Sequence, residues 1–365
     1  MTRFETLERF NYEQLLQFYD ETTGLKGFIC VHNTKLGPAL GGTRVWFYEN
    51  EEEAVRDVMR LARGMTYKAA AAGLNLGGAK AVIWATKENY TKMRNDGVLE
   101  EAFWRAFGRN VESLNGRYIT AEDVNTRTSD MAYINKETNH VAGLEGKSGN
   151  PSPITALGTY YSIKASFKHQ TGSDSLIDKV IAVQGAGNVA TTLCEMLYKD
   201  GAKILISDLP KLAQDRIDFI VNNYGATFID PDILMEQPCD CFAPCALGEI
   251  LNEESINKLK TKIVAGAANN VLQSIEKDGQ LLHDKGIIYA PDYVANAGGL
   301  INVYHELHGY NLEKVKIDVE KIYNRVFQIL EESKRTNVPT SKIADLMAER
   351  RIQMVSDVCR GYLGE

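Results

Sequence analysis

Two lysines stand among small and apolar residues in the first third of the chain. Lys68 lies in the string MTYKAAAAG (65–73), and Lys80 lies in NLGGAKAV (75–82). Removal of an amine from water lowers its pKa from about 10.4 toward the working pH of an enzyme, and a second cation nearby lowers it further. A lysine in such a place is able to bind a carboxylate or to carry a proton. Most lysines instead extend to the surface, so this second interpretation stays open for each of them.

Asp123 is a third group with suitable chemistry. It lies in the string ITAEDV (119–124), just beyond an apolar run, where a carboxylate is able to orient a lysine or to transfer a proton itself. An equally good structural interpretation is that Asp123 caps a helix that starts in the following Asn-Thr-Arg segment. Gly77 and Gly78, which precede Lys80, are expected to leave room for a ligand rather than for packing.

A separate pattern predicts a dinucleotide site in the second half of the chain. The string QGAGNVA (184–190) has the spacing G-x-G-x-x-A, follows an apolar run and opens an amphipathic stretch. In such a motif Gly185 allows a tight turn, Gly187 lets a pyrophosphate approach the backbone, and the small Ala190 lets helix and strand pack closely. Free N–H groups at the helix start then bind the phosphates.

The same pattern requires an acidic residue about twenty positions further on, where it accepts hydrogen bonds from the ribose hydroxyls. Asp208 follows the apolar run at 203–207 and meets this requirement. Because a carboxylate at this place repels a 2′-phosphate, the sequence predicts NAD rather than NADP as the cofactor.

These groups need two different scaffolds. In the N-terminal part the pattern predicts a strand at 27–32, a glycine-rich turn at 36–44 and a helix that ends near Lys68. From about residue 150 strand and helix patterns alternate as in βαβ units, which implies a parallel sheet with helices on its faces. The expected strands of that sheet lie at 180–184, 203–207, 239–243, 262–264 and 286–289.

The sequence therefore predicts an α/β protein of two domains with a cleft between them. Residues 1–140 are expected to form the substrate-binding and catalytic domain, and 141–330 a Rossmann-type NAD-binding domain. The stretch 312–361 has a helical pattern throughout, and the helices within 331–365 are expected to pack back onto the N-terminal domain. The length of 365 residues supports two domains, because single cores stop growing near about 300 residues.

The composition is that of a globular protein and disfavours several kinds of partner. Apolar residues make up 44% of the chain, charged residues make up 24%, and the formal net charge is −7. This modest acidity gives no electrostatic reason to bind nucleic acid or an anionic membrane, and no apolar run approaches the about 18 residues of a membrane span. We therefore expect a cytoplasmic protein with neither of these partners.

The six cysteines are too sparse for a disulfide scaffold and are expected to be reduced thiols. Cys239, Cys241 and Cys245 lie close together, but their segment supplies no fourth ligand. We therefore expect no metal site, and we expect these three as small side chains on a strand and its following loop.

Six strings resemble, in matching order, the amino-acid dehydrogenases of the glutamate/leucine/phenylalanine/valine superfamily, with the leucine branch nearest. They are distributed over nearly the whole chain, so the resemblance is far more specific than any single motif. The strings are LGPALGGTR (36–44), MTYKAAAAGLNLGGAK (65–80), NGRYITAEDV (115–124), QGAGNVA (184–190), FAPCALG (242–248) and YAPDYVANAGGLIN (289–302).

The resemblance implies reversible, NAD-dependent oxidative deamination of an L-amino acid to a 2-oxo acid and ammonia. In that family the lysine of the MTYK string holds the substrate α-carboxylate, which is Lys68 here. The lysine of the GGxK string activates water and transfers protons, which is Lys80, and the aspartate of AEDV, Asp123, assists proton transfer at the amino group. The family forms homo-oligomers, octamers in the leucine branch, so the N-terminal domain is also expected to serve in oligomerisation.

The same resemblance places further residues along the two ligands. Gly41 and Gly42 are expected beside the substrate. The residues expected along NAD, besides Gly185 and Gly187, are Thr155, Asn188, Val189, Asp208, Ala246 and Asn270. Asn125, Ala79 and Asn269 depart from the leucine-branch pattern without removing a proposed catalytic group. Asn125 replaces a glycine, and asparagine is among the few residues that tolerate positive φ.

Positions that bind the substrate side chain in glutamate-specific relatives match, or lie near, four apolar residues here, which are Leu40, Val303, Ala121 and Leu300. A side-chain carboxylate among them would lose water without gaining a partner. The resemblance thus implies a hydrophobic substrate, with leucine and its branched neighbours favoured. Leu300 is larger than the valine expected in a leucine enzyme, and GLINVY (299–304) resembles relatives that act on aromatic amino acids. Phenylalanine or tryptophan is therefore the alternative.

Two other classes of protein would share the dinucleotide fold. A 2-hydroxy acid dehydrogenase needs a histidine paired with a carboxylate, and none of the six histidines stands in a recognisable setting of that kind. A non-catalytic NAD-binding regulator would need Gly185 and Asp208 but neither of the two lysines.

Overall fold

Two six-stranded sheets, one in each of two units, organise the chain. The computed structural model describes residues 3–147 and 149–362. The first unit comprises Met1–Gly149, Val303–Tyr310 and Ala348–Glu365, and the second comprises Asn150–Asn302 and Asn311–Met347. The predicted fold class, an α/β protein of two domains, is confirmed by this division and by the two sheets.

The division between the units differs in detail from the predicted domain boundaries. The chain leaves the first unit after Gly149 rather than at residue 140. Residues 331–347, which we expected on the N-terminal domain, belong to the second unit, and only the part from Ala348 onward lies in the first. The last residues of that expected segment, 363–365, lie outside the described residues.

The C-terminal stretch forms two helices, α13 (Leu312–Thr336) and α14 (Thr340–Tyr362), rather than one helical run. Asn337 ends α13 in the left-handed region at φ 55°. Pro339 follows and lacks the N–H that a continuing helix needs. Because α13 packs along α6 (Ser152–Thr171), it belongs to the second unit.

In the first unit β5 is the central strand. The strands of this sheet are β1 (Gln14–Tyr19), β2 (Lys26–Asn33), β3 (Ala39–Leu40), β4 (Thr43–Trp46), β5 (Gly77–Trp84) and β6 (Tyr118–Ile119). Their order is β1-β2-β5-β3-β6, and β4 also pairs with β5. β5 is antiparallel to β2 along one edge, whereas its other edge is parallel to β3 in its first half and to β4 in its second half. Lys80 lies in the middle of this strand.

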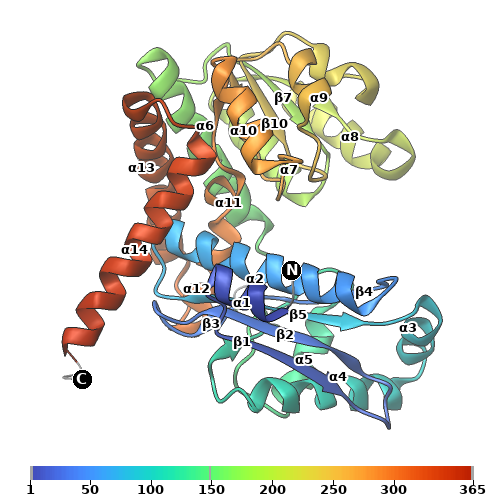
Figure 1. The fold of residues 1–365 in the computed structure, drawn as a ribbon. Helices are drawn as coiled ribbons and strands as arrows, with labels where there is room; N and C mark the ends of the chain where they lie inside the picture. The colour runs from blue at the N-terminus through green and yellow to red at the C-terminus, as the bar shows by residue number, and fades with distance from the viewer. Residues whose placement is uncertain (1–2, 148, 363–365) are drawn as a thin grey trace. The chain divides into compact units, whose positions relative to one another are not determined.

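Helices cover both faces of the first sheet (Figure 1). The helices of this part are α1 (Arg3–Phe10), α2 (Glu51–Ala71), α3 (Lys87–Arg94), α4 (Gly97–Glu112) and α5 (Thr128–Asn135). α2 packs on one face, against Cys30 and Val82, and α4 and α5 pack on the other, against Ala81 and Ile83. Because side chains alternate along a strand, Lys80 shares the α2 face with Val82.

Helix α2 forms where the sequence predicts a helix. The side chain of Asn50 caps it by accepting a hydrogen bond from a backbone N–H of the first turn. Val55, Val58 and Ala62 are buried along the stripe that faces the sheet. Lys68 lies within the last turn of the helix, so its backbone is held rigidly against the sheet.

The second sheet is parallel throughout. Its strands are β7 (Val180–Gln184), β8 (Lys203–Ser207), β9 (Thr227–Phe228), β10 (Cys241–Pro244), β11 (Ile263–Val264) and β12 (Ile288–Tyr289). Their order is β12-β11-β10-β7-β8-β9, which is that of a doubly wound dinucleotide-binding fold. The predicted strands 180–184 and 203–207 coincide with β7 and β8.

The remaining helices follow the strands of the second sheet, as the alternating pattern predicts. They are α7 (Asn188–Lys199), α8 (Pro210–Tyr224), the short 3₁₀ helix η1 (Pro231–Glu236), α9 (Glu253–Lys258), α10 (Ile275–Asp284), α11 (Asp292–Ala295) and α12 (Gly298–Leu307). α7 begins directly after the glycine-rich turn that follows β7, so its first N–H groups lie at the carboxyl end of the sheet.

Three features bear on ligands and compartments: the apolar character of the helices, the placement of possible metal ligands and the state of the cysteines. Among the residues in 3–147 and 149–362, no helix is long and apolar enough to cross a membrane, and no group of His, Cys, Asp or Glu is placed to hold a metal ion. The five cysteines whose side chains are described, Cys30, Cys194, Cys239, Cys241 and Cys245, are free thiols. Burial raises the pKa of the Cys245 thiol to about 12, which keeps it protonated.

Replacement of Phe107 by alanine is expected to destabilise the first unit. Phe107 is fully buried on α4, and its ring meets that of Phe18 edge-on with centroids 5.7 Å apart. Loss of the ring leaves a cavity that costs about 3–5 kcal/mol. Denaturant unfolding measures this change, and Val98→Ala, at an exposed position of the same helix, should cost less than about 0.5 kcal/mol. Equal losses for the two variants would show that α4 does not pack as described.

Candidate active site

The amine of Lys80 is buried in the first unit beside an acid. Only 7% of the lysine side chain is exposed, and its Nζ lies 2.9 Å from Oδ2 of Asp123. The strand around the lysine is paired on both edges, and Asp123 follows β6 of the same sheet. Lys80 therefore does not extend to the surface, which decides between the two interpretations of its setting.

The structure also decides between the two interpretations of Asp123. The helix that follows, α5, has Arg127 as its N-cap residue, so Asp123 is not the cap. Its carboxylate instead faces Lys80 and Arg44, which both contact Oδ2, and 24% of the side chain is exposed. Within the described residues no hydrogen bond is donated to Oδ1. No described protein group therefore occupies that oxygen as an acceptor.

Arg44 and Asp57 are two members of this cluster that sequence reasoning missed. Nε of Arg44 lies 3.0 Å from Oδ2 of Asp123, and its Nη1 lies 3.2 Å from Oδ2 of Asp57. The hydroxyl of Tyr48 donates to the same oxygen of Asp57 at 2.6 Å. Two signals were available in the sequence: a cation two positions after the glycines of GGTR, and an acid directly before Val58 in the predicted helix.

The charges of the cluster shift both central pKa values. Burial lowers the pKa of Lys80 below its ordinary value, although the nearby Asp123 opposes the shift. Burial acts to raise the pKa of Asp123, but Lys80 and Arg44 outweigh it and hold that pKa below its ordinary value. The result is an ionised carboxylate beside an amine that loses its proton more readily than an exposed lysine.

Hydrogen bonds of Asn125 hold the loop that carries Asp123. Asn125 adopts the left-handed conformation at φ 60°, as an asparagine in place of glycine allows, and its side chain donates to the carbonyl of Val45 at 3.0 Å. The carbonyl of Asn125 accepts hydrogen bonds from Tyr90 at 2.8 Å and from Arg94 at 3.0 Å. Arg94 in turn makes a bidentate pair with the buried Asp130. This departure from the family pattern therefore leaves the loop well ordered.

The glycines before Lys80 serve packing, which corrects the expectation that they leave room for a ligand. A side chain at Gly78 would collide with the backbone of Thr66 in α2, and one at Gly77 would collide with the carbonyl of Asn33. The approach at Gly78 brings the end of α2 against β5, and the approach at Gly77 brings the end of β2 against it. The expectation was wrong because the sequence does not show which neighbouring backbone fills the space beside a glycine.

Gly41 and Gly42 are expected beside the substrate, and close packing also explains why both positions are glycine. A side chain at Gly41 would collide with the carbonyl of Ala79, and a Cβ at Gly42 would lie 2.8 Å from Cβ of Asp123. The structure therefore brings Gly42, Lys80 and Asp123 together at one corner of the sheet.

The other expected substrate residues occupy separate elements. Lys68 is half-buried in the last turn of α2, Leu40 is buried in β3, and the half-buried Ala121 accepts the N–H of Thr43 at its carbonyl. Leu300 and Val303 lie one turn apart on α12 and therefore share one helix face. Leu300 belongs to the second unit, whereas the other residues of this group belong to the first.

In the second unit the glycine-rich turn has the geometry of a dinucleotide site. Gly185 has φ 104°, and a Cβ there would lie 2.9 Å from that of Ala246. At Gly187, which caps α7, a Cβ would meet nothing within 4 Å, so open space faces the helix start. Asp208 accepts the N–H of Ala186 at 2.7 Å, which ties the turn to the end of β8. These observations fit a pyrophosphate above the turn and a ribose at the carboxylate.

Two of the remaining residues expected along NAD follow strands of the second sheet, and the third lies on α6. Thr155 is half-buried in the first turn of α6, Ala246 is exposed after β10, and Asn270 is exposed after β11 with φ 52°. A hollow of about 300 Å³ lies over the start of α7, lined by Asn150, Ser152, Asn188, Thr191, Thr192 and Arg216. Val189 follows in the same turn. Arg216, on α8, is a cation that sequence reasoning missed, although it lies in the helix after Asp208.

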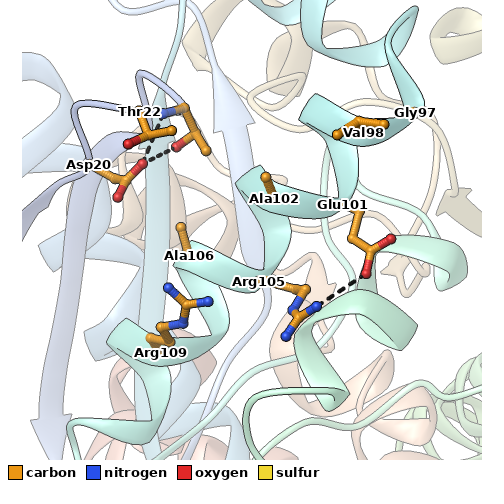
Figure 2. A pocket seen from close by; sticks show the side chains of 10 residues that line it. Asp20, Thr22, Gly97, Val98, Glu101, Ala102, Arg105, Ala106 and Arg109 are labelled. Atoms are coloured by element: carbon orange, nitrogen blue, oxygen red, sulfur yellow. Dashed lines mark hydrogen bonds and ion pairs between the residues drawn. The ribbon is translucent and has the colours of Figure 1, made fainter.

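A larger hollow on the first unit is not part of this site. It measures about 460 Å³ and lies where α4 faces the turn between β1 and β2 (Figure 2). Its two guanidinium groups are already paired: Arg105 with Glu137 at 2.5 Å and with Glu101 at 3.3 Å, and Arg109 with Glu137 at 3.1 Å. None of the residues expected to bind substrate or cofactor lines it.

Comparison with known proteins identifies relatives of both halves of the chain. Residues 13–140 match a model of the Glu/Leu/Phe/Val dehydrogenase dimerisation domain, and residues 204–357 match a model of glutamate/leucine/phenylalanine/valine dehydrogenases. A leucine dehydrogenase of Thermoactinomyces intermedius is 51% identical over 358 residues, which cover 97% of this chain and 94% of that protein. An L-tryptophan dehydrogenase of Nostoc punctiforme is 45% identical and covers 96% of each chain.

The fold has a solved counterpart. The crystal structure of L-tryptophan dehydrogenase from Nostoc punctiforme aligns with a TM-score of 0.85 and 42% sequence identity, over 97% of this chain and 99% of that one. These similarities extend over nearly the full length and confirm the resemblance seen in the six sequence strings. The chain belongs to the glutamate/leucine/phenylalanine/valine dehydrogenase family.

Proposed function

We propose that this chain catalyses the reversible, NAD-dependent oxidative deamination of leucine and other branched-chain L-amino acids. The observation that carries the proposal is the buried contact of Lys80 with Asp123, in a chain that belongs to an amino-acid dehydrogenase family. In this reaction an L-amino acid, NAD and water give a 2-oxo acid, ammonium, reduced NAD and a proton. The 51% identical leucine dehydrogenase supports the choice of leucine.

Lys80 and Asp123 carry the proton transfers in this proposal. The lowered pKa of Lys80 makes its neutral amine available to take a proton from the water that attacks the oxidised α-carbon. Asp123 stays ionised and presents Oδ1 to the amino group, so it is able to accept a proton there and return it when ammonia leaves. Both groups are needed, because water must lose a proton while the amine gains one.

Lys68 binds the substrate α-carboxylate. It lies two residues after Thr66, whose backbone packs against β5 at Gly78, two residues before Lys80. This contact packs the end of the helix that carries Lys68 against the strand that carries Lys80, which supports the proposal. A primary ammonium suits a carboxylate as a point charge.

NAD, when bound, accepts the hydride from the substrate α-carbon. The open space at Gly187 and the N–H groups that begin α7 are suited to its pyrophosphate, with Asn188 and Val189 in the first turn. Gly185 and Ala246 shape the turn beneath it, and Asp208 binds the ribose hydroxyls. Thr155, on α6, and Asn270, after β11, complete the proposed site.

An apolar set of side chains selects the substrate. Leu40, Ala121, Leu300 and Val303 present no cation or hydroxyl to a substrate side chain. Gly41 and Gly42 keep the backbone close to the reacting groups without a side chain in the way. A glutamate side chain would be desolvated without a partner there, whereas an isobutyl group gains from burial.

A second candidate is the same reaction on an aromatic amino acid. Leu300 and the 45% identical L-tryptophan dehydrogenase favour it. We rank an aromatic substrate second, because the identity to a leucine dehydrogenase, 51%, is higher than that to the L-tryptophan dehydrogenase.

We propose that the chain forms a homo-oligomer, specifically an octamer as in the leucine branch. Residues 13–140 match a dimerisation-domain model, which supports this proposal.

We also propose a cytoplasmic location, because the five described cysteines are free thiols, as in a reducing compartment.

A panel of L-amino acids with NAD tests the substrate class. Initial rates of NAD reduction should give leucine, isoleucine and valine the highest kcat/KM, with glutamate lower by at least about 100-fold because its carboxylate finds no partner. Phenylalanine or tryptophan above leucine would select the second candidate. Glutamate above every apolar substrate would refute the substrate assignment in both forms.

The pH dependence of oxidation tests the role of Lys80. Below its pKa the lysine is protonated and cannot accept a proton, so kcat/KM for leucine should fall as the pH is lowered through that pKa. Lys80→Ala should lose about 10²–10⁴-fold in kcat at every pH while it retains NADH binding, measured by fluorescence titration. Lys92→Ala, an exposed position on α3, is the matched control. Full turnover by Lys80→Ala would remove the lysine from the mechanism.

The two glycines of the dinucleotide turn should respond differently to substitution. Gly187→Ala places a methyl group in the open space, so NADH binding should weaken by about tenfold or more while the unfolding temperature stays unchanged. Gly185→Ala strains a residue at φ 104° against Ala246, so it should lower the unfolding temperature. Titration of NADH fluorescence and thermal unfolding measure the two effects. Unchanged NADH binding by Gly187→Ala would place the pyrophosphate elsewhere.

A further inference from the structure

We propose that Arg44 is a positioning residue for the deamination: it holds Oδ2 of Asp123 against Lys80, so that Oδ1 faces the amino group of the substrate. The inference rests on the proposed function, since it gives Arg44 a task within that reaction. Arg44 itself need not touch the substrate.

The strand register places Arg44 on the face of the sheet that α2 covers, which is also the face of Lys80. Arg44 in β4 is the Cα partner of Val82 in β5, and cross-strand partners point to the same face. Val82 shares the α2 face with Lys80. The guanidinium therefore lies between the strand that carries Lys80 and the helix that carries Asp57.

The guanidinium is fixed at both ends. It donates from Nε to Asp123 at 3.0 Å and from Nη1 to Asp57 at 3.2 Å. Asp57 is itself held, since Tyr48 donates to its Oδ2 at 2.6 Å and Arg60 to its Oδ1 at 3.2 Å. A planar guanidinium held at two points has little freedom to rotate, whereas a lysine at this position would reach only one carboxylate.

The consequence for Asp123 lies in how its two oxygens are divided. Both cations contact Oδ2, Lys80 at 2.9 Å and Arg44 at 3.0 Å. With Lys80 alone, the carboxylate would be free to turn either oxygen to the ammonium, because both are equivalent acceptors. The second cation on the same oxygen removes this freedom. The other oxygen is then always presented to the substrate.

Arg44 and Asp57 also act on Lys80 in opposite directions. The charge of Arg44 lowers the pKa of Lys80, and the charge of Asp57 raises it. The titratable groups on the elements around Lys80 include Asp123, Arg44, Tyr118 from β6, Cys30 and His32 from β2, and Asp57, Arg60, Arg63, Tyr67 and Lys68 from α2. Cys30, Tyr67 and Tyr118 remain neutral, because burial raises the pKa of each, and burial lowers the pKa of His32 to about 4, so the imidazole is neutral as well.

The test is the pH profile of leucine oxidation by four variants of the full-length chain. Arg44→Gln should reduce kcat by about tenfold or more, with a smaller change in KM, because proton transfer rather than binding is disturbed. The acid limb of its pH profile is the fall in rate at low pH that we assign to protonation of Lys80. This limb should move to higher pH by about one unit, because a cation near Lys80 is lost and the pKa of Lys80 rises. Asp57→Asn should move the limb in the opposite direction. Arg56→Gln removes a cation from an exposed position of the same helix, outside this network, and should leave the profile unchanged.

Arg44→Lys separates position from charge. It keeps a cation, so the acid limb should stay within a few tenths of a unit of the wild type, but it cannot span Asp123 and Asp57, so kcat should remain low. This variant also decides the matter if Arg44→Gln does not fold. Wild-type kcat for Arg44→Lys would overturn the positioning role, as would limbs that move in the same direction in Arg44→Gln and Asp57→Asn.

The Lys80→Ala variant distinguishes failure of this inference from failure of the proposed function. If Lys80→Ala is inactive while both Arg44 variants behave as the wild type, Arg44 has no positioning role and the reaction assignment stands. If Lys80→Ala turns over leucine normally, the proton-transfer assignment fails whatever the Arg44 variants do.

Discussion

A buried ammonium is stable only when a carboxylate compensates for the water it has lost, and the first unit is arranged around this requirement. Lys80 sits on a strand paired along both edges, and Asp123 reaches it from a loop held in place by Asn125 and Arg94. Desolvation favours the neutral amine, while the ion pair keeps the carboxylate charged. The contact thus joins a lysine that loses its proton more readily than an exposed one to a carboxylate that stays charged, and these two groups are the proposed proton carriers.

The two units meet different physical demands. The glycine-rich turn of the second unit offers backbone N–H groups at the start of α7, so the cofactor site proposed there depends on helix geometry and on small residues such as Gly187. The first unit works through side chains, and their pKa values depend on burial and on neighbouring charges from several strands and from α2. The proposed cofactor site therefore depends on local geometry, whereas the proposed proton transfer depends on a network assembled from distant parts of the chain.

This difference explains what the sequence alone could predict. β7, β8 and the turn at Gly185 were predictable because strand, glycine spacing and helix are adjacent in the chain, and the family could be recognised from ordered strings. The contact of Arg44 with Asp57 and the backbone that fills the space at Gly78 depend on tertiary neighbours, which periodicity does not reveal. The predicted domain boundaries differ from the bounds of the two units for the same reason, because α13 belongs to the second unit through its packing on α6.

The tight packing of the Gly77–Lys80 strand separates the parts of this protein that can vary from those that cannot. Each of its glycines is pressed against the backbone of another segment, so a side chain at either glycine would displace the strand that carries Lys80. The apolar residues proposed to contact the substrate side chain lie outside this strand, on β3 and α12 among other elements. A lineage can accordingly drift from one amino acid to another through a few such exchanges while its chemistry is inherited intact, and an engineer seeking a new substrate should mutate there first.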